Sequence, residues 1–180
     1  MRRNYKLTAS QKYWIPIILL AYEVAVYLSN DMYLPALPEI AKQLNASADQ
    51  VQKTMTAWFF GSCSVTLFLS PVVDYIGRKR VLVGGCGLFV LSCIACALAY
   101  DINFMIAVRF IQGMCVCVVF VAGYTCIHEW YSGKKAIQIL AWMGSITILA
   151  PSVGTYLGAW IVHIFSWQMT FWMLTIWGLL

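Results

Sequence analysis

Six apolar stretches follow one another along the chain, separated by short polar segments. A helix needs about 20 mostly apolar residues to cross the hydrocarbon core of a bilayer. Of the 180 residues, 62% are hydrophobic and 11% are charged, whereas soluble proteins carry roughly 25% charged residues. The sequence therefore predicts an all-α integral membrane protein, because only helices and closed barrels satisfy their backbone polar groups in lipid.

The polar segments place the expected membrane spans. Pro35 and Pro38 mark the end of the first span, and Asp101 and Asn103 form the turn before the fourth. The last stretch covers only about 20 Å of a hydrocarbon core about 30 Å thick. We therefore expect one six-helix unit over residues 1–180 whose last helix is truncated, as in a fragment or a shortened gene product. The expected spans are about 14–34, 51–72, 81–99, 104–127, 136–164 and 167–180.

The basic residues are unevenly divided between the two ends of these spans. Cytoplasmic loops of membrane proteins carry an excess of Lys and Arg. If the N-terminus is cytoplasmic, the inner side holds nine of the twelve basic residues and the outer side only Lys42 and Lys53. We therefore expect a multi-pass inner-membrane protein with a cytoplasmic N-terminus. The inner group is Arg2, Arg3, Lys6, Lys12, Arg78, Lys79, Arg80, Lys134 and Lys135.

The first span carries two acidic residues, Glu23 and Asp31. An ionisable side chain near the centre of a membrane helix costs about 2.5–3.5 kcal/mol on insertion scales, so it is a candidate functional residue. Eight residues give a net rotation of about 80° and a rise of about 12 Å, and Tyr27 lies halfway between the acids. We expect these three side chains to form a slowly winding polar stripe that faces an aqueous cavity.

Such a stripe is suited to proton exchange. Burial in a low-dielectric region disfavours the charged form of a carboxyl, so the group can hold a proton that a cationic ligand displaces. The alternative for each acid is a carboxylate in a fixed salt bridge between helices.

Arg109 is the third ionisable residue inside an expected span. Its depth in the fourth span matches that of Asp31 within about one helical turn, so we expect a direct or water-bridged contact between them. A nearby arginine favours the charged form of a carboxyl and would tune proton release. The alternative is a purely structural tie between helices. Gln112 adds a polar group, and Gly113 would let a neighbouring backbone approach.

The sequence gives little evidence for a metal site or an enzyme active site. All seven cysteines lie in apolar stretches, and Cys93-x-x-Cys96 lacks a second pair or histidines at ligand spacing. His128-Glu129 begins like a zinc-protease signature, but Ser132 stands where the second histidine is needed. We expect no metal, no cofactor and no enzymatic activity. The net charge of +5 reports loop orientation and not a nucleic-acid partner.

Four patterns in the chain resemble motifs of the major facilitator superfamily. They occur in order and on the expected elements, and together they cover essentially the whole chain. The third resembles the antiporter motif of drug/proton exchangers, and the fourth the end of the first span in twelve-helix drug/proton antiporters. The patterns are Asp74-x-x-Gly77-Arg78-Lys79-Arg80, Arg109-x-x-Gln112-Gly113, Ala150-Pro151-x-x-Gly154-x-x-x-Gly158 and Asp31-x-x-x-Pro35-x-x-Pro38.

Further residues look like those of the MdfA-type multidrug/proton antiporters, namely Tyr22-Glu23, Tyr27, Asn30-Asp31-Met32, Gly123-Tyr124 and Glu129. By this resemblance, Glu23, Asp31 and Arg109 would serve in proton coupling. Aromatic and methionine side chains suit lipophilic cations, although plain helix packing is the alternative for them. The expected substrate-site residues are Tyr27, Asn30, Asp31, Met55, Tyr124 and Met143. The expected conformational motifs are Asp74, Gly77, Arg78, Lys79, Pro151, Gly154 and Gly158.

The resemblance implies the N-terminal half of a proton-coupled efflux antiporter of lipophilic or cationic drugs. Its partners would be a small-molecule substrate, protons, the lipid bilayer and a missing C-terminal six-helix half. One alternative is an exporter of another metabolite or a siderophore-like compound, and a second is a non-transporting fragment that needs a second half. Ser70 stands where the first motif usually has glycine, and Tyr75 where it often has arginine. These departures would weaken the switching role of the inner loop.

Overall fold

A computed structural model describes residues 9–131 and 133–179 of the chain. Within this part, the side chains of residues 9–12, 67, 68, 70–72, 74 and 119 are not described. Three residues of the expected basic group lie outside the described residues, namely Arg2, Arg3 and Lys6. The same holds for Leu180, the end of the expected last span. The side chains of Lys12, Ser70 and Asp74 do so as well.

The described residues form α-helices and one short 3-10 helix, and no strand occurs among them. Four segments, 13–43, 78–97, 102–130 and 134–164, are long and apolar enough to cross a membrane. The expected all-α membrane fold is confirmed. The elements are α1 (Ala9–Asp31), η1 (Leu34–Ala36), α2 (Leu37–Gln43), α3 (Ala48–Ile76), α4 (Arg78–Ala97), α5 (Ile102–Trp130), α6 (Lys134–Thr147), α7 (Ala150–Ile164) and α8 (Trp167–Leu179).

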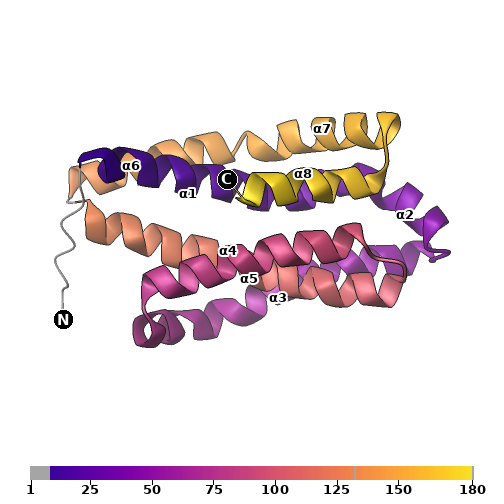
Figure 1. Ribbon diagram of the computed structural model, residues 1–180, viewed down its shortest axis with the longest axis horizontal. Helices are drawn as coiled ribbons and strands as arrows, with labels where there is room; N and C mark the ends of the chain where they lie inside the picture. Colours follow the sequence, from indigo (N-terminus) through magenta and orange to yellow (C-terminus); the bar gives the residue numbers. More distant parts are fainter. Residues whose placement is uncertain (1–8, 132, 180) are drawn as a thin grey trace.

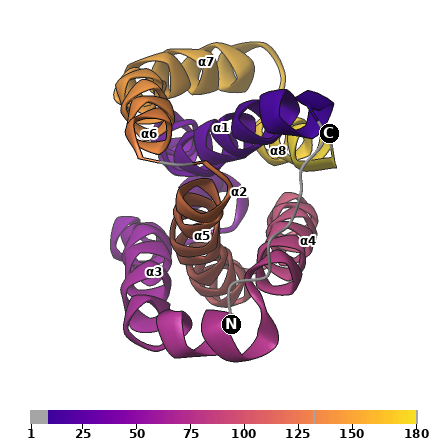
Figure 2. The same ribbon diagram turned by 90° about the vertical axis from the view of Figure 1, so that its left-hand side faces the viewer.

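Helix α5 lies at the centre of the bundle. It packs along both α3 and α4 and also contacts α1 and α6. Figure 2 shows α3, α4 and α5 on one side and α1, α6, α7 and α8 on the other. Contacts of α4 with α8, and of α5 with α1 and α6, join the two groups into one bundle. The largest apolar cluster lies between them, and its most deeply buried members include Tyr33, Phe89, Met105, Trp167 and Phe171.

The connections between helices divide between the two ends of the bundle. In Figure 1 the start of α1 and the α3–α4 and α5–α6 connections share one end. Helix α2 and the α4–α5 and α7–α8 connections share the other end. The first end holds the basic residues at the starts of α4 and α6, whereas Lys42 and Lys53 belong to the second. Positive charge is therefore concentrated at one end of the helices.

The helices extend further into the polar segments than the charged residues of these segments predict. Helix α3 continues to Ile76 and α4 begins at Arg78, so the expected loop at 74–80 is reduced to Gly77. Gly77 has a φ of 100°, which residues with a side chain rarely adopt. The fifth expected span is divided into α6 and α7. Pro151 lies in the first turn of α7, where its missing N–H needs no partner.

Two glycines let α3 and α5 approach each other backbone to backbone. A Cβ added to Gly113 would collide with the carbonyl of Trp58, and one added to Gly61 with the carbonyl of Phe110. Both obstacles are backbone atoms, so a side-chain rotation cannot relieve the collision. Gly113 therefore has the packing role that its sequence position predicts.

We expect Gly113→Ala to lower the midpoint of thermal unfolding of the purified chain, measured by circular dichroism in detergent. Overpacking at a tight helix contact costs about 1–3 kcal/mol. Gly84→Ala is the matched control, since nothing lies within 4 Å of the added Cβ. Equal midpoints for the two variants would contradict the close backbone approach.

Candidate functional site

Glu23 is buried where α1, α5 and α6 meet, and only 2% of its surface is exposed. Its Oε1 accepts a hydrogen bond from the Tyr124 hydroxyl at 2.6 Å and lies 3.3 Å from the Thr147 hydroxyl. Its Oε2 has no hydrogen-bond partner in the described structure. The carboxyl is thus held by hydroxyl groups, and no basic side chain of the described residues is among its contacts. The alternative of a fixed salt bridge does not describe this residue.

The carboxyl of Glu23 borders a small hollow, here called the acid hollow. Most of its walls are apolar or aromatic, and it is too small to hold a water molecule. The polar stripe was expected to face an aqueous cavity, and at Glu23 that expectation is wrong for this conformation. Side chains of α5 and α6 fill the space instead. The lining residues are Leu19, Glu23, Phe120, Gly123, Tyr124 and Met143.

Tyr27 joins the acid hollow through an aromatic row. Its ring packs edge-on against Phe120, with centroids 5.5 Å apart. Phe120 packs edge-on against Tyr124 at 5.8 Å. Edge-on aromatic pairs of this kind are attractive beyond the area that they bury. The stripe predicted on α1 therefore has an acid at each end and an aromatic group in the middle.

Asp31 lies at the end of α1 and is half-buried. The amide nitrogen of Asn30 approaches its Oδ1 at 3.5 Å, and the Asn30 Oδ1 is buried without a partner in the described structure. On α7, a Cβ added to Gly154 would come within 3.0 Å of the Asp31 Cβ. Asp31 is thus placed beside α7.

Arg109 is completely buried. Its Nη1 donates to the backbone carbonyl of Ser29 at 2.9 Å and to Oε1 of Gln112 at 2.8 Å. The guanidinium lies 3.7 Å from the centroid of the Tyr33 ring. Its Nε and Nη2 have no hydrogen-bond partner in the described structure. Stacking and charge-assisted hydrogen bonds therefore hold this cation in place.

The expected contact between Arg109 and Asp31 is not formed. Arg109 reaches α1 through the carbonyl of Ser29, whereas the Asp31 side chain lies beside Gly154 of α7. Equal depth in the membrane did not determine the direction of the side chains. Residues two apart on a helix differ by about 200° in direction, so neighbouring positions on α1 face different helices.

Sequence reasoning found some members of the acid hollow and missed others. Tyr124 and Met143 were expected at the site and line the hollow. Met55 of α3 packs instead against the large apolar cluster. Phe120 and Thr147 were missed, since an aromatic or a threonine in an apolar span is ordinary. Thr147 follows Met143 by four residues, so helical spacing could have placed both on one face.

The glycines of the fifth-span motif face α1. The closest neighbour of a Cβ added to Gly154 is the Leu28 side chain at 2.9 Å, and a Cβ on Gly158 would collide with the Met32 backbone. Pro151 lies one turn before Gly154, in the first turn of α7. The motif thus forms the contact between α7 and the helix that carries both acids.

Among the described side chains, the motif at the α3–α4 junction includes an ion pair that the sequence did not indicate. Arg78 and Glu129 approach to 2.5 Å and link the start of α4 to the end of α5. Gly77 forms the junction itself, and Lys79 is exposed. The expected role of Asp74 concerns a side chain outside the described part.

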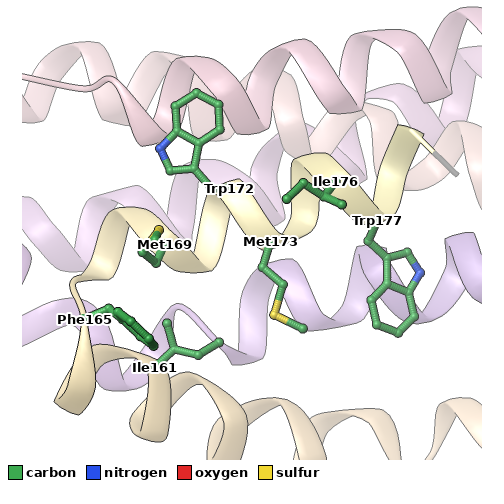
Figure 3. Close-up of a pocket in the computed structure, with 7 residues that line it drawn as sticks. All are labelled: Ile161, Phe165, Met169, Trp172, Met173, Ile176 and Trp177. Atoms are coloured by element: carbon green, nitrogen blue, oxygen red, sulfur yellow. The ribbon is translucent and has the colours of Figure 1, made fainter.

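An apolar groove of about 350 Å³ lies between α7 and α8 (Figure 3). No ionisable side chain lines it, so it does not belong to the acid site. The indole N–H of Trp177 donates to the carbonyl of Ala21 at 3.0 Å and fixes one wall to α1. The lining residues are Ile161, Phe165, Met169, Trp172, Met173, Ile176 and Trp177.

Metal ligands do not gather in the described part of the chain, where no three His, Cys, Asp or Glu residues are placed to hold an ion. Cys93 and Cys96 are buried free thiols. The amide of Gln112 donates to the Cys93 sulfur at 3.1 Å. These thiols contribute to helix packing beside Arg109.

The family model of the Major Facilitator Superfamily matches residues 19–180. The chain belongs to this superfamily. The acid hollow, Arg109 and the glycine motif of α7 all lie within the matched region. Together with its apolar helices, membership makes the chain a multi-pass membrane protein of a transporter family.

Three curated relatives align with this chain over stretches of similar length. The multidrug transporter MdfA of Yersinia pestis is 34% identical over 163 residues, which is 91% of this chain and 40% of that protein. The chloramphenicol resistance protein CraA of Acinetobacter baumannii is 34% identical over 173 residues, 95% of this chain and 42% of that protein. The multidrug resistance protein MdtM of Salmonella typhimurium is 30% identical over 167 residues, which is 93% of this chain and 40% of that protein. The chain thus spans about 40% of the relatives' length.

We expect Arg109→Lys to destabilise the chain, although it keeps the charge. A lysine cannot stack as a plane on Tyr33 or bond Ser29 and Gln112 in the same fork geometry. Loss of one hydrogen bond to a charged group corresponds to about 1.5–3 kcal/mol in the free energy of unfolding. Denaturant unfolding followed by circular dichroism measures it.

Arg80→Lys is the control for this substitution, because Arg80 is exposed. An Arg109→Lys chain as stable as the Arg80→Lys chain would contradict the structural role assigned to the buried guanidinium.

Proposed function

We propose that this chain forms the N-terminal half of a proton-coupled antiporter that exports lipophilic, often cationic, drugs. The observation that carries the proposal is the buried carboxyl of Glu23, which Tyr124 and Thr147 contact and which has no basic partner among the described side chains. An ionised carboxyl in an apolar surrounding is costly unless a counter-charge or several donors stabilise it. A proton or a cationic ligand meets this need, and the two compete for the same carboxyl.

The surroundings of Glu23 suit a variable cation. Tyr27, Phe120 and Tyr124 form the aromatic row, and Met143 lines the hollow next to them. Aromatic faces attract cations, and methionine adapts to ligands of different shape. Substrate entry requires the hollow to widen, since the described conformation has no room for a water molecule.

Asp31 and Asn30 supply a second polar position along α1. The buried Asn30 Oδ1 lacks a partner in the described structure, and Asp31 lies beside α7. We assign Asp31 to proton coupling and to the substrate path. Arg109 is assigned to proton coupling as well, although its hydrogen bonds go to Ser29 and Gln112 and not to Asp31. Met55 stays a proposed substrate-site residue, although in the described structure it packs against the large apolar cluster.

We assign the conformational change of the transport cycle to two regions, the start of α7 and the α3–α4 junction. Pro151, Gly154 and Gly158 place a break and a close helix contact beside α1. Gly77, Arg78 and Lys79, together with Asp74, form the junction at the basic end of the bundle. The concentration of basic residues at that end supports a cytoplasmic N-terminus in the inner membrane.

A second six-helix half completes the proposed transporter. The relatives named multidrug transporter and chloramphenicol resistance protein are longer, and this chain spans about 40% of them. Transporters of this architecture hold their substrates between two halves. The chain would contribute one wall of the site.

The test uses everted membrane vesicles that contain the chain together with a C-terminal six-helix half of a relative. Adding tetraphenylphosphonium should release protons from acidified vesicles, which a pH-sensitive dye records. The double substitution Glu23→Gln and Asp31→Asn should abolish this exchange, because neither amide can bind and release a proton. Asp49→Asn is the control, since Asp49 is exposed and pairs only with Lys53 among the described residues.

Exchange that persists after both acids are neutralised would refute the proton site. A complete transporter that ignores tetraphenylphosphonium and chloramphenicol but responds to a metabolite or siderophore-like compound would replace the drug substrate. Vesicles with the chain alone should show no exchange, and activity there would refute the need for a second half.

A further inference from the structure

We propose that Thr147 is a positioning residue that couples the protonation of Glu23 to the break between α6 and α7. The inference rests on the proposed proton exchange and adds a residue to it. Thr147 is the last residue of α6, two residues before the start of the α7 capping turn. Its side chain is buried and approaches Glu23.

The Thr147 hydroxyl has two acceptors within reach. It lies 2.5 Å from the backbone carbonyl of Met143 and 3.3 Å from Oε1 of Glu23. A hydroxyl has one proton to donate and two lone pairs to accept with. It therefore donates to only one of these oxygens at a time, and the protonation state of Glu23 decides which.

When Glu23 is neutral, both groups are satisfied by one arrangement. Thr147 donates to the Met143 carbonyl, as its shorter distance indicates, and accepts the acidic proton of Glu23. Tyr124 donates to the same Glu23 oxygen at 2.6 Å. The unpartnered Oε2 is then an uncharged carbonyl oxygen, which is less costly to bury than half of a carboxylate.

When the acid hollow widens and Glu23 loses its proton to water, that arrangement no longer works. The O–H bond of the acid is broken and the carboxylate can only accept, so the Thr147 hydroxyl turns to donate to it. Hydrogen bonds to a charged acceptor are roughly twice as strong as neutral ones. The Met143 carbonyl in the last turn of α6 then loses its side-chain donor.

This exchange of partners occurs at the joint of the fifth span. Threonine bonds to the carbonyl four residues earlier bend helices, and here the bond ends where α6 ends. Helix α7 continues from the joint and packs through Gly154 on the Asp31 segment of α1. Proton release at Glu23 is thereby linked to the angle between two helices that both contact α1.

The groups that face Glu23 are few in the described structure. Helix α5 contributes Tyr124, α6 contributes Thr147 and Met143, and α1 itself contributes Tyr27. Of these, Tyr124 and Tyr27 are titratable, and a tyrosine hydroxyl carries no charge near physiological pH. Arg109 is engaged with Ser29 and Gln112. The response of Glu23 to pH is therefore sensitive to the Thr147 hydroxyl.

The experiment follows the carbonyl band of protonated Glu23 by infrared difference spectroscopy on the 180-residue chain in lipid nanodiscs. The Glu23→Gln chain identifies the band by its absence. Thr147→Val keeps the shape but removes the hydroxyl, and should raise the pH at which half of the band is lost by about one pH unit. Thr147→Ser restores the hydroxyl and should return that midpoint to its value in the unaltered chain.

Ser145→Ala is the matched control on the same helix. Ser145 makes the same type of bond, to the Ala141 carbonyl at 2.9 Å, but is exposed. Its loss should leave the midpoint unchanged. If Thr147→Val folds poorly, Thr147→Ala serves as the second hydroxyl-free variant, and helix content is checked by circular dichroism.

The outcomes separate the two proposals. A Glu23 band that titrates identically with and without the Thr147 hydroxyl overturns the positioning role and leaves the proposed function intact. A Glu23 that never changes its protonation state overturns the proton site, and the role of Thr147 with it. A midpoint that shifts in Thr147→Ser as much as in Thr147→Val would show that only packing matters, which also overturns the inference.

Discussion

Inside a bilayer, a carboxyl must find its hydrogen-bond partners within the protein, because lipid offers none. Glu23 meets this constraint with one hydroxyl from α5 and one from α6. Their residues lie more than a hundred positions further along the chain, so this small contact fixes how α1 sits against two distant helices. The aromatic row and the dry hollow follow from it, since rings and methionine fill the remaining space around the acid.

Arg109 faces the same constraint with the opposite charge and meets it differently. It combines a backbone carbonyl, an amide oxygen and an aromatic face, all from residues that have no charge of their own. The described structure therefore keeps its buried acid and buried base on separate contacts. In the proposed mechanism this leaves the acid free to bind a proton or a cation, whereas a closed salt bridge with Arg109 would cancel both charges.

Composition and hydrophobic pattern were sufficient to predict a helical membrane fold, and the approximate positions of the helices followed from the polar segments. The helix ends differ from the expected positions, because α3 continues to Ile76 and α4 already begins at Arg78. Both helices therefore extend into the segment that its charges predicted as a loop. The division of the fifth span depends on Pro151 and on packing against α1. For the site, the presence of ionisable residues in apolar spans pointed to Glu23 and Arg109. The depth of a residue in the membrane did not predict the direction in which its side chain points. The spacing of Thr147 from Met143 could have placed both on one helix face, but the contact of Thr147 with Glu23 was not readable from the sequence.

The backbone contact between α3 and α5 has a mechanical consequence. Helices that touch through Gly61 and Gly113 cannot slide past each other without a collision of main-chain atoms, so this pair moves as one rigid body. Helices α6 and α7, in contrast, meet at a joint of two residues. Tyr124 belongs to the rigid pair and Thr147 to the joint. The two hydroxyls that hold Glu23 thus belong to different parts of the bundle, and a relative movement of these parts would change the hydrogen bonds of the carboxyl.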